Sequence, residues 1–455
     1  MTNSSQLDRL LTRTQLGWRE PLEAFEVLKD TPFALLLNGG GGRWSYICAN
    51  PMRTLEVKAA DGPGDLVEAR AAMADLPFER PGDAPPFCGG WAGLLSYEYG
   101  RALLPKLGTK PARGRWPDIA LGLYNELIAF DHESRRAEHF YWGWQDAKTE
   151  QLLSLYSAPR KNLSVKGPLT SITTARMLRK DYEARLGRTV DYVHAGDCFQ
   201  SNISQRFDFE LNADRHPFNL TRRLAASSRA PFSAYFRLPG LALASNSPER
   251  FLQIVVEPGG GLKAVTQPIK GTRPRGKTDE EDRALANELL SSEKDLAENL
   301  MIVDLMRNDL SRISTPGSVR VPKLQALETY ANVHHLVSTI EATLAPGRDA
   351  FDVIKAAFPG GSVTGAPKIR AMQIIEELEE EARGPYCGSL AWISPDGAMD
   401  SSILIRTVAF EEEEDGGWRG HFRSGGGIVA DSVPAEEYTE TLDKARAIRA
   451  ALEGE

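Results

Sequence analysis

The order of predicted elements favours an α+β fold, with helices beside antiparallel sheets, over a doubly wound α/β fold. Residues 30–145 contain short apolar runs separated by turns, which is typical of strands. The clearest runs are Pro32 to Leu37, Trp44 to Ala49, Arg53 to Ala59, Ile119 to Phe130 and Ala137 to Trp144. Further along the chain, predicted helices separate antiparallel ribbons more often than they connect parallel strands. No fixed repeat period is visible.

The chain divides into two predicted regions, residues 1–160 and residues 175–455. Between Leu155 and Thr174 the composition shifts to Ser, Pro, Lys and Thr, which is typical of a linker. The first region has one clear helical pattern, from Asp65 to Leu76. The second opens with a helical period of apolar residues from Met177 to Ala195 and closes with a helix from Pro434 to Leu452.

Helices and strands alternate in the rest of the second region. The predicted strands are Cys198 to Phe209, Phe232 to Leu238, Ser318 to Val321, Val333 to Leu344 and Met399 to Phe410. The predicted helices are Pro217 to Ser227, Thr278 to Leu310, Ala350 to Ala357 and Ala366 to Arg383. A hairpin is predicted to turn at Pro395-Asp396-Gly397.

Composition excludes several classes of protein. The 455 residues carry a net charge of −8 with the two signs well mixed, so no basic face predicts nucleic-acid binding. No run of eighteen apolar residues predicts a membrane span. The four cysteines lack CxxC spacing, which is typical of reduced thiols rather than of a disulfide framework or zinc site. We therefore expect a cytoplasmic protein whose partners are small molecules or other proteins.

The main candidate functional residue of the second region is a lysine that lies between a proline and a glycine. In Gln267-Pro268-Ile269-Lys270-Gly271-Thr272, the proline restricts the backbone before Lys270 and the glycine frees it afterwards. The runs 251–256 and 263–269 pair naturally as a hairpin across three glycines. Such a hairpin brings Glu249 and Lys270 to the same end of one ribbon. The alternative is that both are solvated loop charges.

Two helices carry candidate metal ligands. Glu298 lies in an apolar helical stretch without a local cation, whereas Asp304 in the same stretch has Arg307 three positions on. Buried carboxylates need a metal, a cation or a proton, so the metal interpretation is favoured for Glu298. On the closing helix Glu437, Glu440 and Lys444 share one face; the alternative is an ordinary surface ion pair.

Three further segments have the chemistry of an anion site, each with a structural alternative. The glycine-rich loop 358–368 runs into a helix, where exposed amides bind anions, but it is equally a tight turn. Arg406 in an apolar strand needs a carboxylate or phosphate, which a protein acid could also supply. The triple glycine 425–427 offers bare backbone to a ligand, or is simply a bulge. On pattern alone, His335 is a structural hydrogen-bonding residue.

Together these segments resemble the chorismate-using enzymes, a family that includes the anthranilate, aminodeoxychorismate, isochorismate and salicylate synthases. The resemblance covers essentially the whole chain and is densest from about Met177 onwards. Its most specific segments are SPERF at Ser247 to Phe251, PIKGT at Pro268 to Thr272, ENLMIVDLMRNDL at Glu298 to Leu310, HHLVSTI at His334 to Ile340, FPGGSVTGAPKIRAM at Phe358 to Met372 and GGGIVADS at Gly425 to Ser432.

The resemblance implies a fold of two antiparallel sheets packed as a sandwich and flanked by helices, like that of anthranilate synthase component I. Within the family, the lysine of PIKGT is typical of aminodeoxychorismate synthases, which aminate chorismate for p-aminobenzoate and folate synthesis. Anthranilate synthases carry alanine there and remain the alternative. Isochorismate-type enzymes place a water-activating lysine where this chain has Gln200, which argues against water as the nucleophile. A non-catalytic scaffold would have lost Glu249, Glu298, Glu440 or Arg406, and all four are present.

The resemblance also assigns roles to residues. Lys270 would attack ring carbon 2 of chorismate while Glu249 protonates the departing 4-hydroxyl. Glu298 and Glu440, with Glu437 one turn away, would hold Mg²⁺ on the ring carboxylate, because hard oxygen ligands suit this ion. The remaining substrate contacts would be Gly271, Thr272, His335, Thr364, Arg406, Gly426, Gly427 and Lys444.

Two further implications concern partners and regulation. No segment is similar to a glutaminase, so the resemblance implies a separate glutamine amidotransferase subunit that supplies ammonia. Some relatives bind tryptophan in the amino-terminal sandwich, and the matching segments here contain Arg43, Trp44 and the run Pro231-Phe232-Ser233. Only the last segment matches well. A serine expected near Gly39 is absent, which argues against tryptophan binding.

Overall fold

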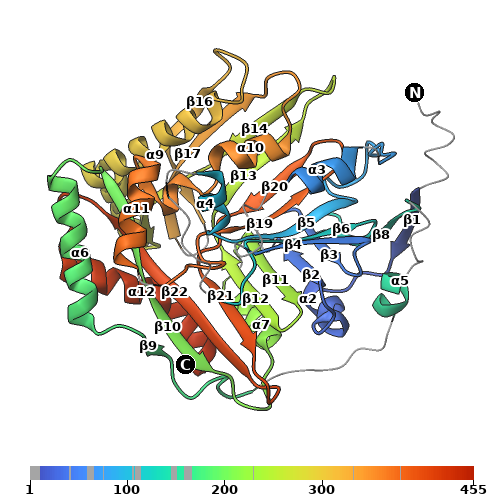
Figure 1. Cartoon of the computed structure of the whole chain (residues 1–455), viewed down its shortest axis with the longest axis horizontal. Coiled ribbons are helices and arrows are strands. Elements are labelled where there is room, and N and C mark those ends of the chain that lie inside the picture. Colours follow the sequence, from blue (N-terminus) through green and yellow to red (C-terminus); the bar gives the residue numbers. More distant parts are fainter. Residues whose placement is uncertain are drawn as a thin grey trace.

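Two antiparallel β-sheets with helices around them make up the protein (Figure 1). The structure is a computed structural model that describes residues 11–39, 42–58, 66–74, 76–104, 107, 114–144, 151–157, 166–228, 230–330, 333–379 and 381–454. Within these ranges, no helix has both the length and the apolar character needed to cross a membrane. The predicted α+β class with two packed antiparallel sheets is confirmed.

The first sheet has twelve strands. Along its path they are β1 (Leu11–Leu16), β8 (Arg136–Trp142), β7 (Glu126–Asp131), β3 (Trp44–Cys48), β2 (Leu35–Asn38), β11 (Phe232–Leu238), β12 (Leu241–Ser247), β21 (Thr407–Glu412), β22 (Trp418–Ile428), β10 (Gln200–Glu210) and β18 (Gly365–Ala366), with β9 (Thr174–Ala175) on β10. The longest pairing joins β10 to β22, from Ser201 opposite Ile428 to Glu210 opposite Arg419.

The second sheet has ten strands. In order they are β15 (Ile269–Pro274), β17 (Val333–Thr343), β14 (Leu262–Thr266), β13 (Arg250–Val256), β20 (Met399–Ser402), β19 (Ser389–Ile393), β5 (Gly90–Leu95), β6 (Ile119–Tyr124) and β4 (Arg53–Val57), with β16 (Arg320–Thr329) on β17. Facing side chains of the two sheets share one buried apolar cluster, in which Tyr46 of β3 packs 6.3 Å from Trp392 of β19 between ring centroids.

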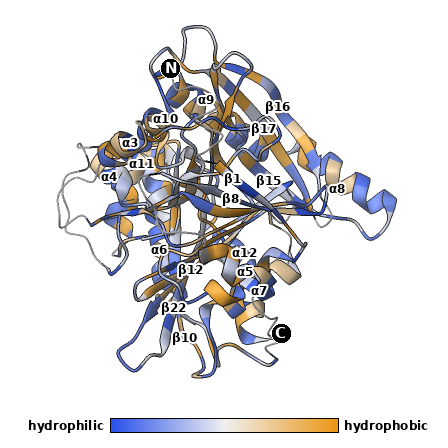
Figure 2. Cartoon of the chain, turned by 90° about the vertical axis from the view of Figure 1, so that its right-hand side faces the viewer, coloured by the Kyte–Doolittle hydropathy of each residue, from blue (hydrophilic) through white to orange (hydrophobic). Residues whose placement is uncertain are grey.

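The helices cover the outer faces and the ends of the sheets. They are α2 (Pro21–Phe25), α3 (Val67–Ala74), α4 (Tyr99–Leu103), α5 (Gln151–Tyr156), α6 (Arg179–His194), α7 (Pro217–Ser227), α8 (Asp279–Ser291), α9 (Glu293–Ser311), α10 (Ala350–Ala357), α11 (Lys368–Leu378) and α12 (Pro434–Glu453). Figure 1 shows α6 and α12 beside β10 and β22, and α12 contacts both α6 and β22. In Figure 2 the far end of α8 is strongly hydrophilic, as its run of acids at 279–282 predicts.

The predicted hairpin is confirmed, and its end positions two candidate residues. Strand β13 pairs antiparallel with β14, from Val256 opposite Leu262 to Gln253 opposite Val265. Glu249 directly precedes β13. Lys270 follows β14 but belongs to β15, which pairs with β17 instead. Pro268 separates β14 from β15 because it lacks the N–H group that a continuous ladder requires.

Four sequence predictions need correction or qualification. The predicted strand from Ile119 to Phe130 is wrong, because it is β6 of the second sheet and β7 of the first. The predicted strand 399–410 is wrong: it is β20 in the second sheet and β21 in the first, because the chain changes sheets between them. The predicted helix 278–310 is two helices, since Ser292 caps α9. Residues 158–165 of the predicted linker lie outside the described residues, and both sheets join strands from the two predicted regions, through β2 with β11 and β5 with β19.

Candidate active site

One cavity of about 650 Å³ gathers nearly all the residues predicted to act on chorismate. Its walls come from β15, β17, β22, α9, α12 and the segment between β20 and β21. The predicted residues that line it are Glu249, Lys270, Gly271, Thr272, Glu298, His335, Arg406, Gly426, Gly427, Glu437, Glu440 and Lys444. Since these come from positions up to about two hundred residues apart in sequence, the fold itself assembles the site.

Lys270 is positioned by its backbone. Gly271 has a φ of 78°, and a Cβ added there would come within 2.7 Å of the Leu289 side chain. Only glycine can adopt this backbone conformation while the side chains of α8 and α9 lie so close to its Cα. The Lys270 Nζ lies 3.9 Å from Glu298 Oε2, and both side chains are largely buried.

Glu249 is a buried acid on the same cavity. Its residue is 6% exposed, and burial raises the pKa of its carboxyl above the ordinary value. A hydrogen bond with the Ser362 hydroxyl and the charge of Lys270 oppose that rise without cancelling it. A raised pKa favours the protonated form of the carboxyl, and that form can donate a proton to a leaving group.

The three predicted metal ligands each pair with a lysine. Besides the Lys270–Glu298 pair, Lys294 Nζ lies 3.7 Å from Glu437 Oε1 and Lys444 Nζ lies 2.7 Å from Glu440 Oε1. Burial raises the pKa of Glu298, partly offset by Lys270 and Lys294. Burial also acts to raise the pKa of Glu440, but the charge and hydrogen bond of Lys444 bring it below the ordinary value.

The carboxylates suit magnesium by their chemistry, since hard oxygen donors from two helices face one cavity. They are not gathered into a closed cage: across the described ranges, no three His, Cys, Asp or Glu side chains lie close enough together to hold a metal ion. Each carboxylate is instead paired with a lysine. The donor chemistry suits the ion, and magnesium binding itself stays a prediction.

Arg406 is a cation that lines the cavity. It has a φ of 51°, uncommon for a residue with a Cβ, and lies in the segment where the chain changes sheets. Burial lowers the pKa of its guanidinium, and no carboxylate among the described residues forms an ion pair with it. Strain and an unmatched charge at one residue are typical of a ligand-binding position. Of the two alternatives left open by the sequence, the protein acid is not observed.

His335 lies beside Arg406 on the cavity wall. Its Nδ1 is 2.9 Å from the Thr272 hydroxyl oxygen. Burial lowers the pKa of His335, and the charge of Arg406 lowers it further, so the ring is neutral at physiological pH. The histidine therefore acts here as a hydrogen-bonding group.

The triple glycine belongs to the regular strand β22 rather than to a bulge. A Cβ at Gly425 would collide with the backbone of Ile203, and one at Gly427 with the side-chain amide of Gln200. A Cβ at Gly426 would lie 3.4 Å from both Glu437 Oε2 and Lys444 Nζ. The glycines thus allow strand packing on one side and keep the cavity floor bare on the other.

Thr364 is the one predicted substrate contact outside the cavity lining. It is fully buried, and its hydroxyl donates to the Gly360 carbonyl at 2.9 Å. Nearby, a Cβ at Gly360 or Gly361 would press on Ile403 or Leu305, so the loop is a tight structural turn at these positions. Sequence reasoning missed Ser362, Asn202 and Lys294, which do line the cavity. Of these three residues, only Lys294 could have been identified from the sequence, because it is a basic residue among acids shortly before Glu298.

A second cavity, of about 200 Å³, contains the residues considered for tryptophan. Arg43, Trp44, Pro231, Phe232 and Ser233 all line it. The Arg43 guanidinium lies over the Trp44 ring and pairs with Asp131 at 2.9 Å. The structure thus brings the candidates together, and the expectation from the sequence, which argued against tryptophan binding, stays untested.

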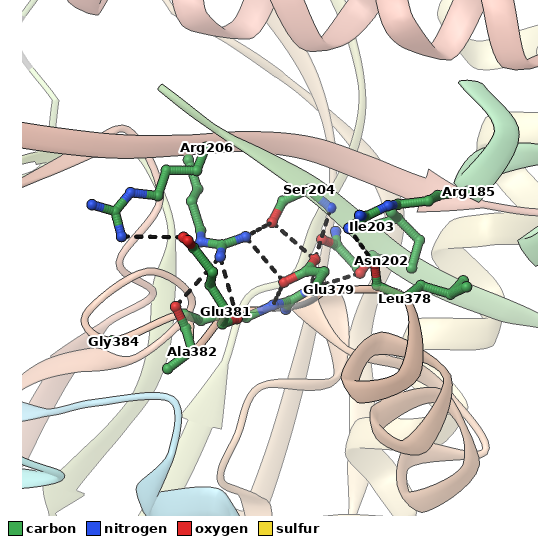
Figure 3. Close-up of polar contacts among 12 residues, drawn as sticks. Arg185, Asn202, Ile203, Ser204, Arg206, Leu378, Glu379, Glu381, Ala382 and Gly384 are labelled. Atoms are coloured by element: carbon green, nitrogen blue, oxygen red, sulfur yellow. Dashed lines mark hydrogen bonds and ion pairs between the residues drawn. The ribbon is translucent and has the colours of Figure 1, made fainter. Parts of the chain in front are cut away.

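A buried charge cluster supports the wall of the active-site cavity (Figure 3). Glu379, just after α11, accepts hydrogen bonds from the Ser204 N–H at 2.8 Å, the Arg383 Nε at 2.9 Å and the Arg423 Nη1 at 3.2 Å. Arg383 also donates to the Asn202 carbonyl at 2.7 Å, so the two side chains cover the edge of β10 between its partners β18 and β9. Arg423 lines the active-site cavity from this anchored position.

Comparison with known proteins adds the family. Residues 32–450 match the family model described as chorismate binding enzyme. The chain is similar to aminodeoxychorismate synthase component 1 of Klebsiella aerogenes, with 40% identity over 96% of this chain and 98% of that protein. It is 39% identical to anthranilate synthase component 1 of Thermus thermophilus, over 95% of each chain. The crystal structure of anthranilate synthase component I from Streptococcus pneumoniae matches with a TM-score of 0.77 and 30% identity over 90% of this chain and 92% of that one. This chain therefore belongs to the family of chorismate-binding enzymes.

Proposed function

We propose that the chain is the synthase component of an aminodeoxychorismate synthase, which converts chorismate and ammonia to 4-amino-4-deoxychorismate. The observation that carries the proposal is the pair Lys270 and Glu249 on one cavity: an amine held by the PIKGT backbone and a carboxyl with a raised pKa. The similarity to aminodeoxychorismate synthase component 1 of Klebsiella aerogenes supports the same product.

The reaction replaces a hydroxyl by an amino group in two displacements. The Lys270 amine forms a bond to ring carbon 2, the two ring double bonds shift, and the carbon–oxygen bond at carbon 4 breaks. Glu249 gives its proton to the departing hydroxyl, which leaves as water. Ammonia then bonds to carbon 4, the double bonds shift back, and the bond to Lys270 breaks with return of the electron pair to its nitrogen. The new ammonium group gives up one proton, which restores the protonated carboxyl of Glu249. The net change is chorismate plus ammonia to aminodeoxychorismate plus water.

The other cavity residues bind and orient the substrate. Arg406 and the bare backbone at Gly426 and Gly427 suit the enolpyruvyl carboxylate, because no acid among the described residues forms an ion pair with the guanidinium. Glu298 and Glu440, with Glu437 beside them, would hold Mg²⁺, which when bound would neutralise the ring carboxylate. Neutral His335 and the Thr272 hydroxyl would donate or accept hydrogen bonds at the ring.

Ammonia is the co-substrate, and we infer that a separate glutamine amidotransferase subunit supplies it. The component 1 name of the Klebsiella aerogenes relative supports a second component. The product would serve p-aminobenzoate and folate synthesis in the cytoplasm, and the enzyme would be classed with the aminotransferases.

Product identity tests the proposal. The purified chain is incubated with chorismate, Mg²⁺ and an ammonium salt, and the products are separated and identified by mass. We expect aminodeoxychorismate. Anthranilate would contradict the assignment and favour the second candidate, which the 39% identity to an anthranilate synthase supports.

The Lys270→Ala variant tests the covalent step. It should lose product formation by at least about a thousandfold, because the first displacement has no nucleophile. Intact-protein mass should show a chorismate-derived adduct on the wild type when ammonia is withheld. The same adduct on Lys270→Ala would contradict the role of Lys270.

A further inference from the structure

Three lysines balance the three carboxylates of the active-site cavity. Lys270 is the proposed nucleophile, and Lys444 is a substrate contact by the family resemblance. Lys294 has no such role, yet it lines the same cavity and lies 3.7 Å from Glu437. Glu437 is 7% exposed and also accepts a 2.7 Å hydrogen bond from Ser432. A buried carboxylate of this kind requires a nearby cation, and Lys294 supplies it.

Local helix physics does not explain a lysine at this position. Ser292 caps α9, so Lys294 is the second residue of the helix. The amino end of a helix carries partial positive charge and favours acids, as the flanking Glu293 and Asp295 illustrate. A lysine there is unfavourable by itself. The carboxylates of α9 and α12 in front of it provide the compensating interaction.

The ion pair between Lys294 and Glu437 is also long and partly exposed to solvent. The Lys294 side chain is 52% exposed, and its 3.7 Å separation from Glu437 is longer than a close ion pair. A long, partly solvated side chain at the mouth of a cavity can withdraw into solvent at small cost. Lys294 is therefore held by charge rather than by a fixed hydrogen bond.

We propose that Lys294 is the resident counter-ion of the carboxylate cluster, which balances its charge in the metal-free chain and which magnesium displaces on binding. This inference rests on the proposed magnesium site. Lys294 is then a positioning residue: it orients the Glu437 carboxylate through their ion pair, and it sets the affinity for the metal by competing with it. Its removal should tighten metal binding, whereas loss of an ordinary structural residue would not.

Calorimetric titration of the metal-free protein with Mg²⁺ alone tests the competition. Lys294→Met should bind Mg²⁺ on the order of tenfold more tightly than the wild type, since one positive charge near a divalent ion is removed. Lys294→Arg keeps the charge and should retain the wild-type affinity. Lys180→Met is the matched control, because Lys180 is an exposed lysine at the second position of α6, outside the cavity lining.

Thermal unfolding gives an independent readout. In a chelator, Lys294→Met should melt below the wild type, because buried Glu437 has lost its cation. On addition of Mg²⁺ its melting temperature should rise by more than that of the wild type, as tighter binding to the folded state requires.

Two results would overturn the proposal, and they are distinguishable. If the wild type binds Mg²⁺ but Lys294→Met binds it equally or more weakly, Lys294 does not compete with the metal. If the wild type neither releases heat nor gains thermal stability with Mg²⁺, the magnesium site itself is wrong and the inference falls with it.

Discussion

Glu249 and Glu379 are both almost fully buried glutamates, at 6% exposure each, but their surroundings shift their pKa values in opposite directions. Glu249 faces the active-site cavity with one hydroxyl partner, Ser362, and burial raises its pKa. Glu379 lies under β10, where burial alone would also raise its pKa, but Arg383 and Arg423 hold it below the ordinary value. The positive charge beside the carboxylate decides the direction of the pKa shift: two arginines adjoin Glu379, whereas Glu249 has only the charge of Lys270.

This difference distinguishes charged groups that can bind a ligand from charged groups that stabilise the fold. In the Glu379 cluster both carboxylate oxygens accept hydrogen bonds from arginines, so this acid is paired within the protein and holds the wall in place. The cavity around Glu249 has the reverse property: its ion pairs are partly loose, and Arg406 has no acid partner among the described residues. Incomplete pairing there leaves charge available for a dianionic substrate.

The largest effect on the catalytic rate should come from neutralising Glu249, the acid that faces the cavity. Glu249→Gln should lower kcat by about 10²–10⁴-fold, because the amide cannot protonate the leaving hydroxyl. In the wild type the rate should fall as pH rises and Glu249 ionises, at a pH above the ordinary glutamate value of 4.5. A pH profile of kcat/KM measures this limb.

The same substitution, Glu249→Gln, should raise the stability of the folded protein although it lowers kcat. When folding raises the pKa of a carboxyl, its contribution to the stability of the folded protein is fully present at a pH below the unfolded-state pKa. That contribution is lost as the pH rises through the folded-state pKa. Glu249→Gln stays neutral, so above that pH it should unfold at higher denaturant concentration than the wild type. Ser362→Ala is the companion variant: it removes a hydrogen bond that lowers the pKa and should shift the alkaline limb upwards. Wild-type kcat in Glu249→Gln would rule out the acid role.

Neutralising the structural glutamate should cost stability instead. Glu379→Gln leaves Arg383 and Arg423 buried without a counter-charge, and we expect the free energy of unfolding to fall by about 3–5 kcal/mol. Because the pKa of Glu379 is lowered, its contribution is present above the unfolded value and is lost as pH falls through the folded one. Urea unfolding at neutral and acidic pH measures both effects.

A nearby glutamate provides the control for this variant. Glu381 pairs with Arg176 and Arg206, but its side chain is 31% exposed, so Glu381→Gln should cost no more than about 1 kcal/mol. An equal loss in the two variants would mean that burial does not separate these two acids.

How far the sequence could predict this comparison depends on the range of the interactions. PIKGT, the acids of the closing helix and the β13–β14 hairpin are local patterns, so the sequence could predict their local conformation. Glu379 was read only as part of a helix, because its partners Ser204 and Arg423 lie far from it in the chain. The strand through Arg406 was misjudged because its apolar pattern continues across the point where the chain passes from β20 to β21.

The smallest effect should come from a carboxylate that has a solvated partner. Asp304 lies on the same helix as Glu298 and pairs with Arg307 at 2.8 Å, but the two side chains are 62% and 51% exposed. Solvent screens such a pair, so Asp304→Asn should change the free energy of unfolding by no more than about 0.5 kcal/mol and leave kcat/KM and Mg²⁺ affinity unchanged. Glu298→Gln, six residues earlier and facing the cavity, should weaken Mg²⁺ binding by at least about tenfold, since it removes a carboxylate ligand and its charge. Calorimetric titration of both variants compares the two faces of α9. A similar loss of metal affinity in Asp304→Asn would mean that the charge of the whole helix, rather than the carboxylates facing the cavity, attracts the ion.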